Sequence, residues 1–268
     1  MLKKQPIKRK KTLLERSSTI VSVNENFEKI DLNDYKIEYK VCKTNLGFTY
    51  ICKNKKINKL YFMKILKKAK LLASKDIEHV TNEYLILSSV FHPFIIELRG
   101  INNTNPITLY FLYEYIPGGS LNTLLLIQKR LPLNSARFYL ASIITAFDYL
   151  HKKNIIYRDL RPQNILINKD GYIKLAEFSF AKKMDNEFTF TMCGSPEYYS
   201  PEMVMKSGYN KSTDFWSLGI ILYEMLIGCT PFLDSDPLKI YQKIKQGKIL
   251  FPKKLDKNAK MIIKHFLN

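Results

Sequence analysis

The sequence has 268 residues, of which 46% are apolar, 13% aromatic and 25% charged, so it can form a sizeable core in one or two compact lobes. This composition excludes wholesale disorder, collagen and coiled coil. The 43 Lys and Arg residues outnumber the 24 Asp and Glu residues, and the formal net charge is +19. No apolar run reaches the roughly 18 residues of a membrane-spanning helix, and no apolar block of the secretory-signal type follows the N-terminus. We expect a soluble protein of the cytoplasm or nucleus.

The N-terminal stretch is strongly basic. Residues 1–16 contain seven Lys and Arg residues and one Glu. We expect residues 1–32 to form a basic, disordered tail. An alternative is an arm that binds anionic lipid or nucleic acid through residues 1–16. No aromatic residue interleaves this run, which weakens the case for nucleic acid.

Alternating β-branched and aromatic residues predict the strands of a first lobe, which we place at residues 33–116. The predicted strands lie near 35–42, 47–54, 58–66, 98–103 and 108–115. The first three form a meander with turns at Gly47 and at 54–58. A helix-like segment at about 76–89 precedes the last two strands.

Pro117-Gly118-Gly119 is a strong breaker, and it marks the start of a second lobe at residues 117–268. Apolar residues recur at helical spacing through 134–152 and 214–227. Two short strand-like pieces, 165–167 and 172–175, interrupt the helical pattern. The second lobe is therefore predicted to be mainly helical.

The run Tyr157-Arg158-Asp159-Leu160-Arg161-Pro162-Gln163-Asn164 has the spacing of a phosphoryl-transfer catalytic loop. In such a loop an Asp accepts the proton of the substrate hydroxyl, and an Asn five residues later holds a metal ion. Further motifs occur in the matching order: Lys64, Glu83, Glu177-Phe178-Ser179, Cys193-Gly194-Ser195-Pro196-Glu197-Tyr198 and Ser200-Pro201-Glu202. From about residue 33 to its end the chain resembles the eukaryotic protein kinases, and among them the cyclic-AMP-dependent kinases of the AGC group.

The resemblance implies an α+β, two-lobed protein-kinase fold. The small lobe would hold an antiparallel sheet and one helix, and the mainly helical large lobe would be incomplete at its C-terminal end. The resemblance also implies that ATP and Mg²⁺ are bound. Asp159, Arg161 and Lys64 would be catalytic, and Asn164 and Glu177 would bind the metal. The nucleotide would be bound by Lys64, Glu83, Gly47, Phe62, Thr49, Glu114 and Leu166.

A regulatory phosphosite is implied as well. Thr191 stands where the family carries its activating phosphate, and His79, Arg158 and Lys182 stand where the family reads that phosphate. A phosphothreonine adds a charge of about −1.5 to −2, which two or three cationic side chains could bind.

Several positions depart from the family pattern. Glu177 replaces the metal-binding Asp and Ser179 replaces the Gly after it, while Cys42 and Thr44 replace two glycines of the loop that covers the phosphates. Phe62 replaces an Ala that packs on adenine, and because residues two apart in a strand face the same side, it would share the face of Lys64. The phenyl ring would then fill the adenine slot. The alternative is that Phe62 turns aside and ATP binds.

Two functions of different class follow. The first is an AGC-type Ser/Thr protein kinase that transfers the ATP γ-phosphate to protein Ser or Thr, with impaired catalysis. The second is a catalytically dead pseudokinase that acts as a scaffold or allosteric partner. The expected partners are a protein substrate, a kinase or a regulatory subunit.

Overall fold

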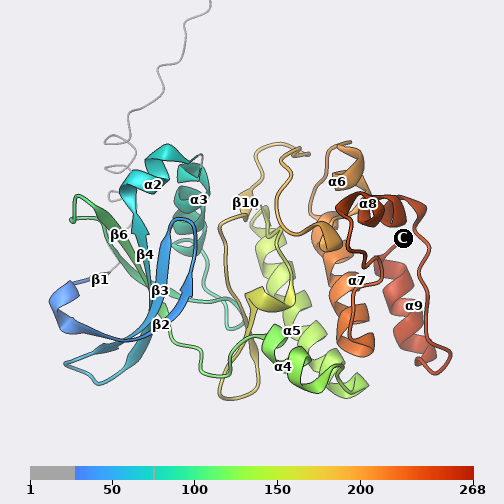
Figure 1. Ribbon diagram of the computed structural model, residues 1–268, viewed down its shortest axis with the longest axis horizontal. Coiled ribbons are helices and arrows are strands. Elements are labelled where there is room, and N and C mark those ends of the chain that lie inside the picture. Colours follow the sequence, from blue (N-terminus) through green and yellow to red (C-terminus); the bar gives the residue numbers. More distant parts are fainter. Residues whose placement is uncertain (1–27, 75) are drawn as a thin grey trace, which may run out of the picture. The chain divides into compact units, whose positions relative to one another are not determined.

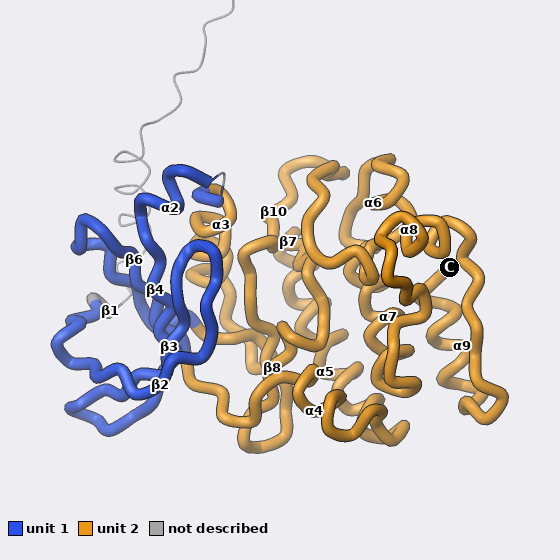
Figure 2. Tube along the Cα trace, in the orientation of Figure 1, with its two compact units in different colours: residues 1–77, 98–113 blue, residues 78–97, 114–268 orange. Residues whose placement is uncertain are grey.

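The computed structural model describes residues 28–74 and 76–268 (Figure 1). The basic run 1–16 and most of the predicted tail lie outside these residues. Contacts divide the chain into two compact units (Figure 2). The small unit contains the described residues up to Ile77 together with Leu98–Tyr113, and the large unit contains Glu78–Glu97 and Glu114–Asn268.

The small unit is built on a six-stranded sheet with the order β1-β5-β6-β4-β3-β2. The strands are β1 (Glu28–Lys29), β2 (Tyr35–Lys43), β3 (Gly47–Asn54), β4 (Leu60–Lys67), β5 (Leu98–Asn102) and β6 (Thr108–Glu114). Strands β2, β3 and β4 form the predicted antiparallel meander, and β5 and β6 are antiparallel. Strand β1 pairs in parallel with β5.

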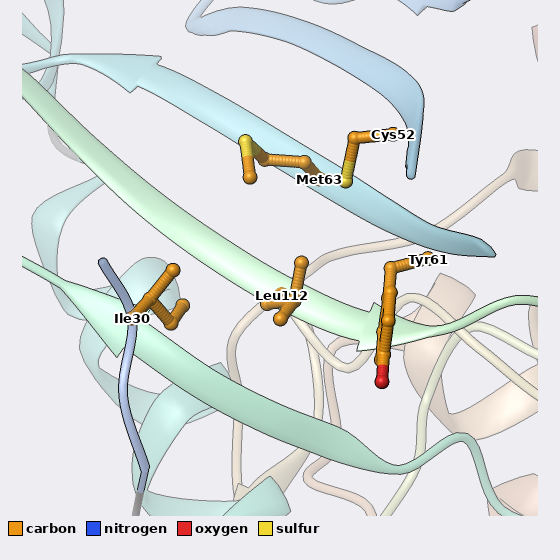
Figure 3. Packing of buried hydrophobic residues seen from close by; sticks show 5 residues of the cluster. All are labelled: Ile30, Cys52, Tyr61, Met63 and Leu112. Carbon is orange, nitrogen blue, oxygen red and sulfur yellow. The ribbon is translucent and has the colours of Figure 1, made fainter. Parts of the chain in front are cut away.

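Residues just before the predicted lobe are part of this sheet. Ile30 is buried in a cluster with Cys52, Tyr61, Met63 and Leu112 (Figure 3). The buried Asn102 side chain donates to the Ile30 carbonyl oxygen at 2.8 Å. Residues 28–32, which the sequence analysis assigned to the tail, are therefore structured. Only two apolar residues lie in this stretch, too few for a periodic pattern to reveal it.

The helix α2 (Lys68–Ala73) also belongs to the small unit, where it packs against β4. It was not predicted, because a helix this short has no room for an apolar repeat. A 3-10 turn, η1 (Leu32–Asp34), joins β1 to β2, and Asp31 caps it by accepting from the Asn33 backbone N–H.

The large unit is mainly helical, as predicted, and with the sheet of the small unit it confirms the α+β class. Its longer helices are α3 (Ile77–Leu87), α4 (Leu121–Gln128), α5 (Leu133–Lys152), α7 (Ser212–Ile227), α8 (Pro237–Gln246) and α9 (Lys257–Phe266). The short elements are β7 (Ile155–Ile156), η2 (Pro162–Asn164), β8 (Ile165–Ile167), β9 (Ile173–Leu175), β10 (Lys182–Lys183), η3 (Pro196–Tyr198) and α6 (Pro201–Met205).

Helix α7 is the centre of the large unit. It packs against α5 and α9, and most of its side chains are buried, which is why its sequence is apolar all round. Side-chain caps fix the N-terminal ends of three other helices: Ser120 caps α4, Asp236 caps α8 and Asp256 caps α9. Among the described residues, none of the helices has both the length and the apolar character of a membrane span.

Candidate active site

The loop between β7 and η2 carries Asp159 and Arg161, two of the three predicted catalytic residues, and α7 fixes its backbone. The third, Lys64, lies on β4. The Asp214 carboxylate, fully buried on α7, accepts from the backbone N–H of Tyr157 at 3.0 Å and of Arg158 at 2.8 Å. It also lies 2.7 Å from His151 Nε2 at the end of α5. These contacts hold Arg158 at a φ of +68°, a conformation that costs energy for a residue with a Cβ.

Tyr157 fastens the loop to the segment after β9. Its hydroxyl donates to the Ala176 carbonyl oxygen, and its ring meets that of Phe178 edge to face with centroids 5.1 Å apart. The Ala176 N–H in turn donates to the Asn164 carbonyl oxygen at 2.9 Å. Ala176, the residue before Glu177, is therefore hydrogen-bonded both to Tyr157 at the start of the loop and to Asn164 just after it.

Asp159 lies in this loop with a perturbed carboxyl group. Burial raises its pKa to about 6, although Arg161 and a hydrogen bond from Asn164 act in the opposite direction. Asn164 Nδ2 donates to Asp159 Oδ2 at 2.6 Å and to the Asp159 carbonyl oxygen at 2.9 Å. The carboxylate is thus held in one orientation, with a pKa suited to accepting a proton near neutrality.

Arg161 places a cation beside Asp159. Its Nη1 donates to Ser195 Oγ at 2.6 Å, whereas its buried Nε has no hydrogen-bond partner within the described part of the chain. A buried guanidinium nitrogen without a partner is costly, and an anion is the group that would satisfy it.

Glu177 and Asn164 carry the oxygen atoms that could hold a cation. The Asn164 side chain uses its nitrogen, Nδ2, for both hydrogen bonds to Asp159. Its side-chain oxygen, Oδ1, is therefore the atom that could bind a metal. Glu177 has a φ of +52°, and its Oε2 accepts from Ser179 Oγ at 3.3 Å. Across residues 28–74 and 76–268 there is no group of three His, Cys, Asp or Glu side chains that could hold a metal. Two protein ligands fit Mg²⁺, which completes its shell with water and substrate phosphates.

Four of the residues predicted to bind the nucleotide, Gly47, Thr49, Phe62 and Lys64, lie in the small unit. Lys64, only 9% exposed, and the half-buried Phe62 are both on β4, and Thr49 on β3 is in register with Lys64. The β2–β3 turn is closed by Thr44, whose Oγ1 accepts from the Gly47 N–H at 3.2 Å. A Cβ at Gly47 would lie 1.9 Å from a carbonyl oxygen of β4, so this position requires glycine.

The remaining predicted nucleotide contacts lie in the large unit. Glu83 is almost fully buried on α3. The Glu114 carboxylate forms an ion pair of 2.7 Å with Lys174 and accepts from the Glu97 N–H at 2.9 Å. Leu166 lies on β8, next to η2. The Glu114 backbone N–H also donates to the Glu97 carbonyl oxygen, at 3.1 Å, so both its side chain and its N–H are engaged within the protein.

Two of the three residues predicted to read a phosphate at Thr191, Arg158 and His79, contact Phe180. Arg158 Nε donates to the Phe180 carbonyl oxygen at 2.6 Å, and the His79 ring meets the Phe180 ring edge to face at 5.3 Å. Lys182 Nζ donates to the hydroxyl of Thr189 at 3.1 Å rather than to that of Thr191, which is exposed.

Sequence reasoning missed the anchoring residues. Asp214 gives a signal that could have been used, because a carboxylate inside an otherwise apolar helix must have buried partners. Tyr209 gives no comparable signal. The structure also joins Tyr198 to Glu224, through a hydroxyl-to-carboxylate hydrogen bond of 2.7 Å, and burial raises the pKa of Glu224 to about 7.

Known proteins are similar to this chain over most of its length. A model of the protein kinase domain matches residues 35–268. The cAMP-dependent protein kinase catalytic subunit 3 of Drosophila melanogaster is 40% identical over 92% of this chain and 42% of its own length. The cAMP-dependent protein kinase catalytic subunit of Dictyostelium discoideum is 44% identical over 82% of this chain and 34% of its own length. The human cAMP-dependent protein kinase catalytic subunit PRKX is 42% identical over 88% of this chain and 65% of its own length. The chain thus spans less than half the length of the first two relatives.

Proposed function

Because the chain belongs to the protein kinase family, we propose that it transfers the γ-phosphoryl group of ATP to Ser or Thr hydroxyls of protein substrates. The observation that supports this most directly is Asp159. Its carboxylate is oriented by Asn164, lies beside the cation of Arg161, and has a pKa of about 6.

In the proposed reaction Asp159 accepts the proton of the substrate hydroxyl. The hydroxyl oxygen forms a bond to the γ-phosphorus, and the bond from that phosphorus to the bridging oxygen breaks, which releases ADP. Arg161 and Lys64 would neutralise phosphate charge during the transfer, and the buried Nε of Arg161 has no hydrogen-bond partner among the described residues. Asn164 and Glu177 would hold Mg²⁺, which when bound supplies further positive charge to the phosphates.

The nucleotide contacts assigned from the resemblance are part of the same proposal. Gly47, Thr49, Phe62 and Lys64 would contribute from the small unit. Glu83, Glu114 and Leu166 would contribute from the large unit. The proposed substrate is a protein with a Ser or Thr target, and Thr191 is proposed as a phosphosite of the chain itself.

A second candidate is a kinase-fold regulator with weak or absent catalysis. The observation that favours it is in the β2–β3 turn, where the Gly47 N–H already donates to Thr44. Glycine N–H groups of such a turn must be available if they are to bind phosphate. Together with Phe62 on the strand of Lys64, this contact would weaken ATP binding.

Partners are proposed on the same basis. The relatives are named as cAMP-dependent kinase catalytic subunits, and we propose that this chain also has a regulatory-subunit or kinase partner. An arm for anionic lipid or nucleic acid at residues 1–16, and a location in the cytoplasm or nucleus, stay proposals. Salt-sensitive binding to anionic vesicles or to RNA that is lost on deletion of residues 1–16 would support the arm.

A thermal-shift titration with ATP, with and without Mg²⁺, separates the two candidates. A ligand that binds only the folded chain must raise the melting temperature. If wild type shifts and transfers labelled phosphate to a Ser or Thr peptide while Asp159→Asn does not transfer, the kinase proposal is supported. If wild type does not shift but Phe62→Ala does, the phenyl ring fills the adenine slot and the regulator is supported.

A further inference from the structure

The segment from Phe188 to Cys193 is held by backbone pairing to Tyr209, which precedes α7. Thr189 and Tyr209 exchange two backbone hydrogen bonds of 2.9 Å each. The Thr189 and Cys193 side chains are buried, whereas the apolar side chains of Phe188, Phe190 and Met192 are exposed. A segment with so much exposed apolar surface gains little from burial, so its order must come from specific hydrogen bonds.

The Tyr209 hydroxyl lies at the centre of these hydrogen bonds. It accepts from Arg158 Nη1 at 3.1 Å and donates to the Thr191 carbonyl oxygen. The Cys193 sulfur lies 4.0 Å from it. Tyr209 is only 2% exposed, so water does not compete for these contacts.

We propose that the Tyr209 hydroxyl is a positioning group that orders the segment 188–193 in the unmodified chain, by linking the fixed Arg158 guanidinium to the Thr191 carbonyl. The link needs no phosphate on Thr191. It concerns the order of the segment and not phosphoryl transfer, so it can hold whether or not the proposed activity does.

Arg158 is a suitable anchor for this link because two of its other donors, the backbone N–H and Nε, are already engaged. Its backbone N–H is bound by Asp214 and its Nε by the Phe180 carbonyl oxygen. A fixed cation next to a hydroxyl polarises the O–H bond, which strengthens the hydrogen bond that the hydroxyl donates. Burial raises the pKa of Tyr209 to about 12, so the hydroxyl keeps the proton it donates.

Gly208 allows the segment to lie this close. It has a φ of +87°, and a Cβ there would lie 2.9 Å from the Phe190 ring. The backbone pairing and the hydroxyl link therefore act on the same segment from adjacent residues.

Hydrogen–deuterium exchange of the full, phosphatase-treated chain tests the proposal. Tyr209→Phe removes only the hydroxyl, and we expect amides of 188–193 to exchange about tenfold faster. This is the factor expected when one buried hydrogen bond linked to a charged side chain, here Arg158, is lost. Tyr223→Phe is the matched control. Its buried hydroxyl also donates to a backbone carbonyl, that of Leu250 at 2.7 Å, so it lowers stability without changing exchange in the segment.

Thr191→Val is a second control variant, which tests whether the Thr191 hydroxyl contributes to the order of the segment. It removes the hydroxyl that a phosphate would modify but keeps the carbonyl that accepts from Tyr209, so we expect exchange at 188–193 to match wild type. The proposal is overturned if Tyr209→Phe exchanges like wild type. It is also overturned if phosphatase-treated wild type already exchanges as fast as Tyr209→Phe while phosphorylated wild type is protected, because phosphate would then be the ordering group.

Discussion

Replacing Asp159 by Asn should make the protein more stable while removing the proposed phosphoryl transfer. Burial raises the pKa of Asp159 from 3.8 to about 6, so the folded chain holds this proton to higher pH than the unfolded chain does. Acid therefore favours the folded state, and this contribution is lost as pH rises from about 4 through 6. Above pH 6 the ionised carboxylate costs about 3 kcal/mol in the folded protein. Asn carries no charge, but its amide cannot accept from Asn164 as strongly, so we expect a gain of about 1–3 kcal/mol at pH 7.5.

The assay is urea unfolding of wild type and Asp159→Asn between pH 4 and 8. The stability difference should be near zero at pH 4 and grow until about pH 7. Asp148→Asn is the matched control, because its carboxylate is 59% exposed and forms only a surface ion pair with Lys152, for which we expect a change of about 0.5 kcal/mol or less. Phosphate transfer to a Ser or Thr peptide should fall about 10²- to 10⁴-fold in Asp159→Asn alone.

A stability difference that is independent of pH would refute the reasoning, since it would mean that Asp159 has an ordinary pKa in the folded chain. Loss of stability in Asp159→Asn at pH 7.5 would refute it too. In that case the contact with Asn164 would outweigh the cost of burying the charge.

Three further predictions concern other parts of the molecule. Gly47→Ala forces a Cβ against a carbonyl oxygen of β4, so we expect a loss of about 1–3 kcal/mol in urea unfolding. Asn102→Ala removes the hydrogen bond to the Ile30 carbonyl, and should also cost about 1–3 kcal/mol, with faster amide exchange in β1 as the direct readout. Tyr198→Phe removes a donor that lowers the pKa of Glu224, so a carboxyl carbon NMR titration should find that pKa above its value of about 7. An unchanged Glu224 titration would contradict the hydrogen bond.

The sequence predicted most of the fold because its signals are local. The strands of the meander, α5 and α7 have clear periodicity, and the spacing of Asp159 and Asn164 is fixed by one short loop. What it could not predict depends on contacts between residues far apart in the chain. Ile30 is ordered by Asn102 on another strand, and the partners of the Tyr209 hydroxyl come from two distant segments. Neither contact can be recognised from the spacing of apolar residues along the sequence.

The anchoring of the catalytic loop by Asp214 limits where control of this protein can act. The amides of Tyr157 and Arg158 are bonded to a carboxylate buried on α7, so opening the loop would deprive that buried carboxylate of hydrogen-bond donors. Loosening the loop would thus cost more than loosening an exposed segment, because a buried charged group would lose its partners. We therefore expect a partner or a modification to act on surface segments that are held by a few hydrogen bonds. The segment 188–193 is an example.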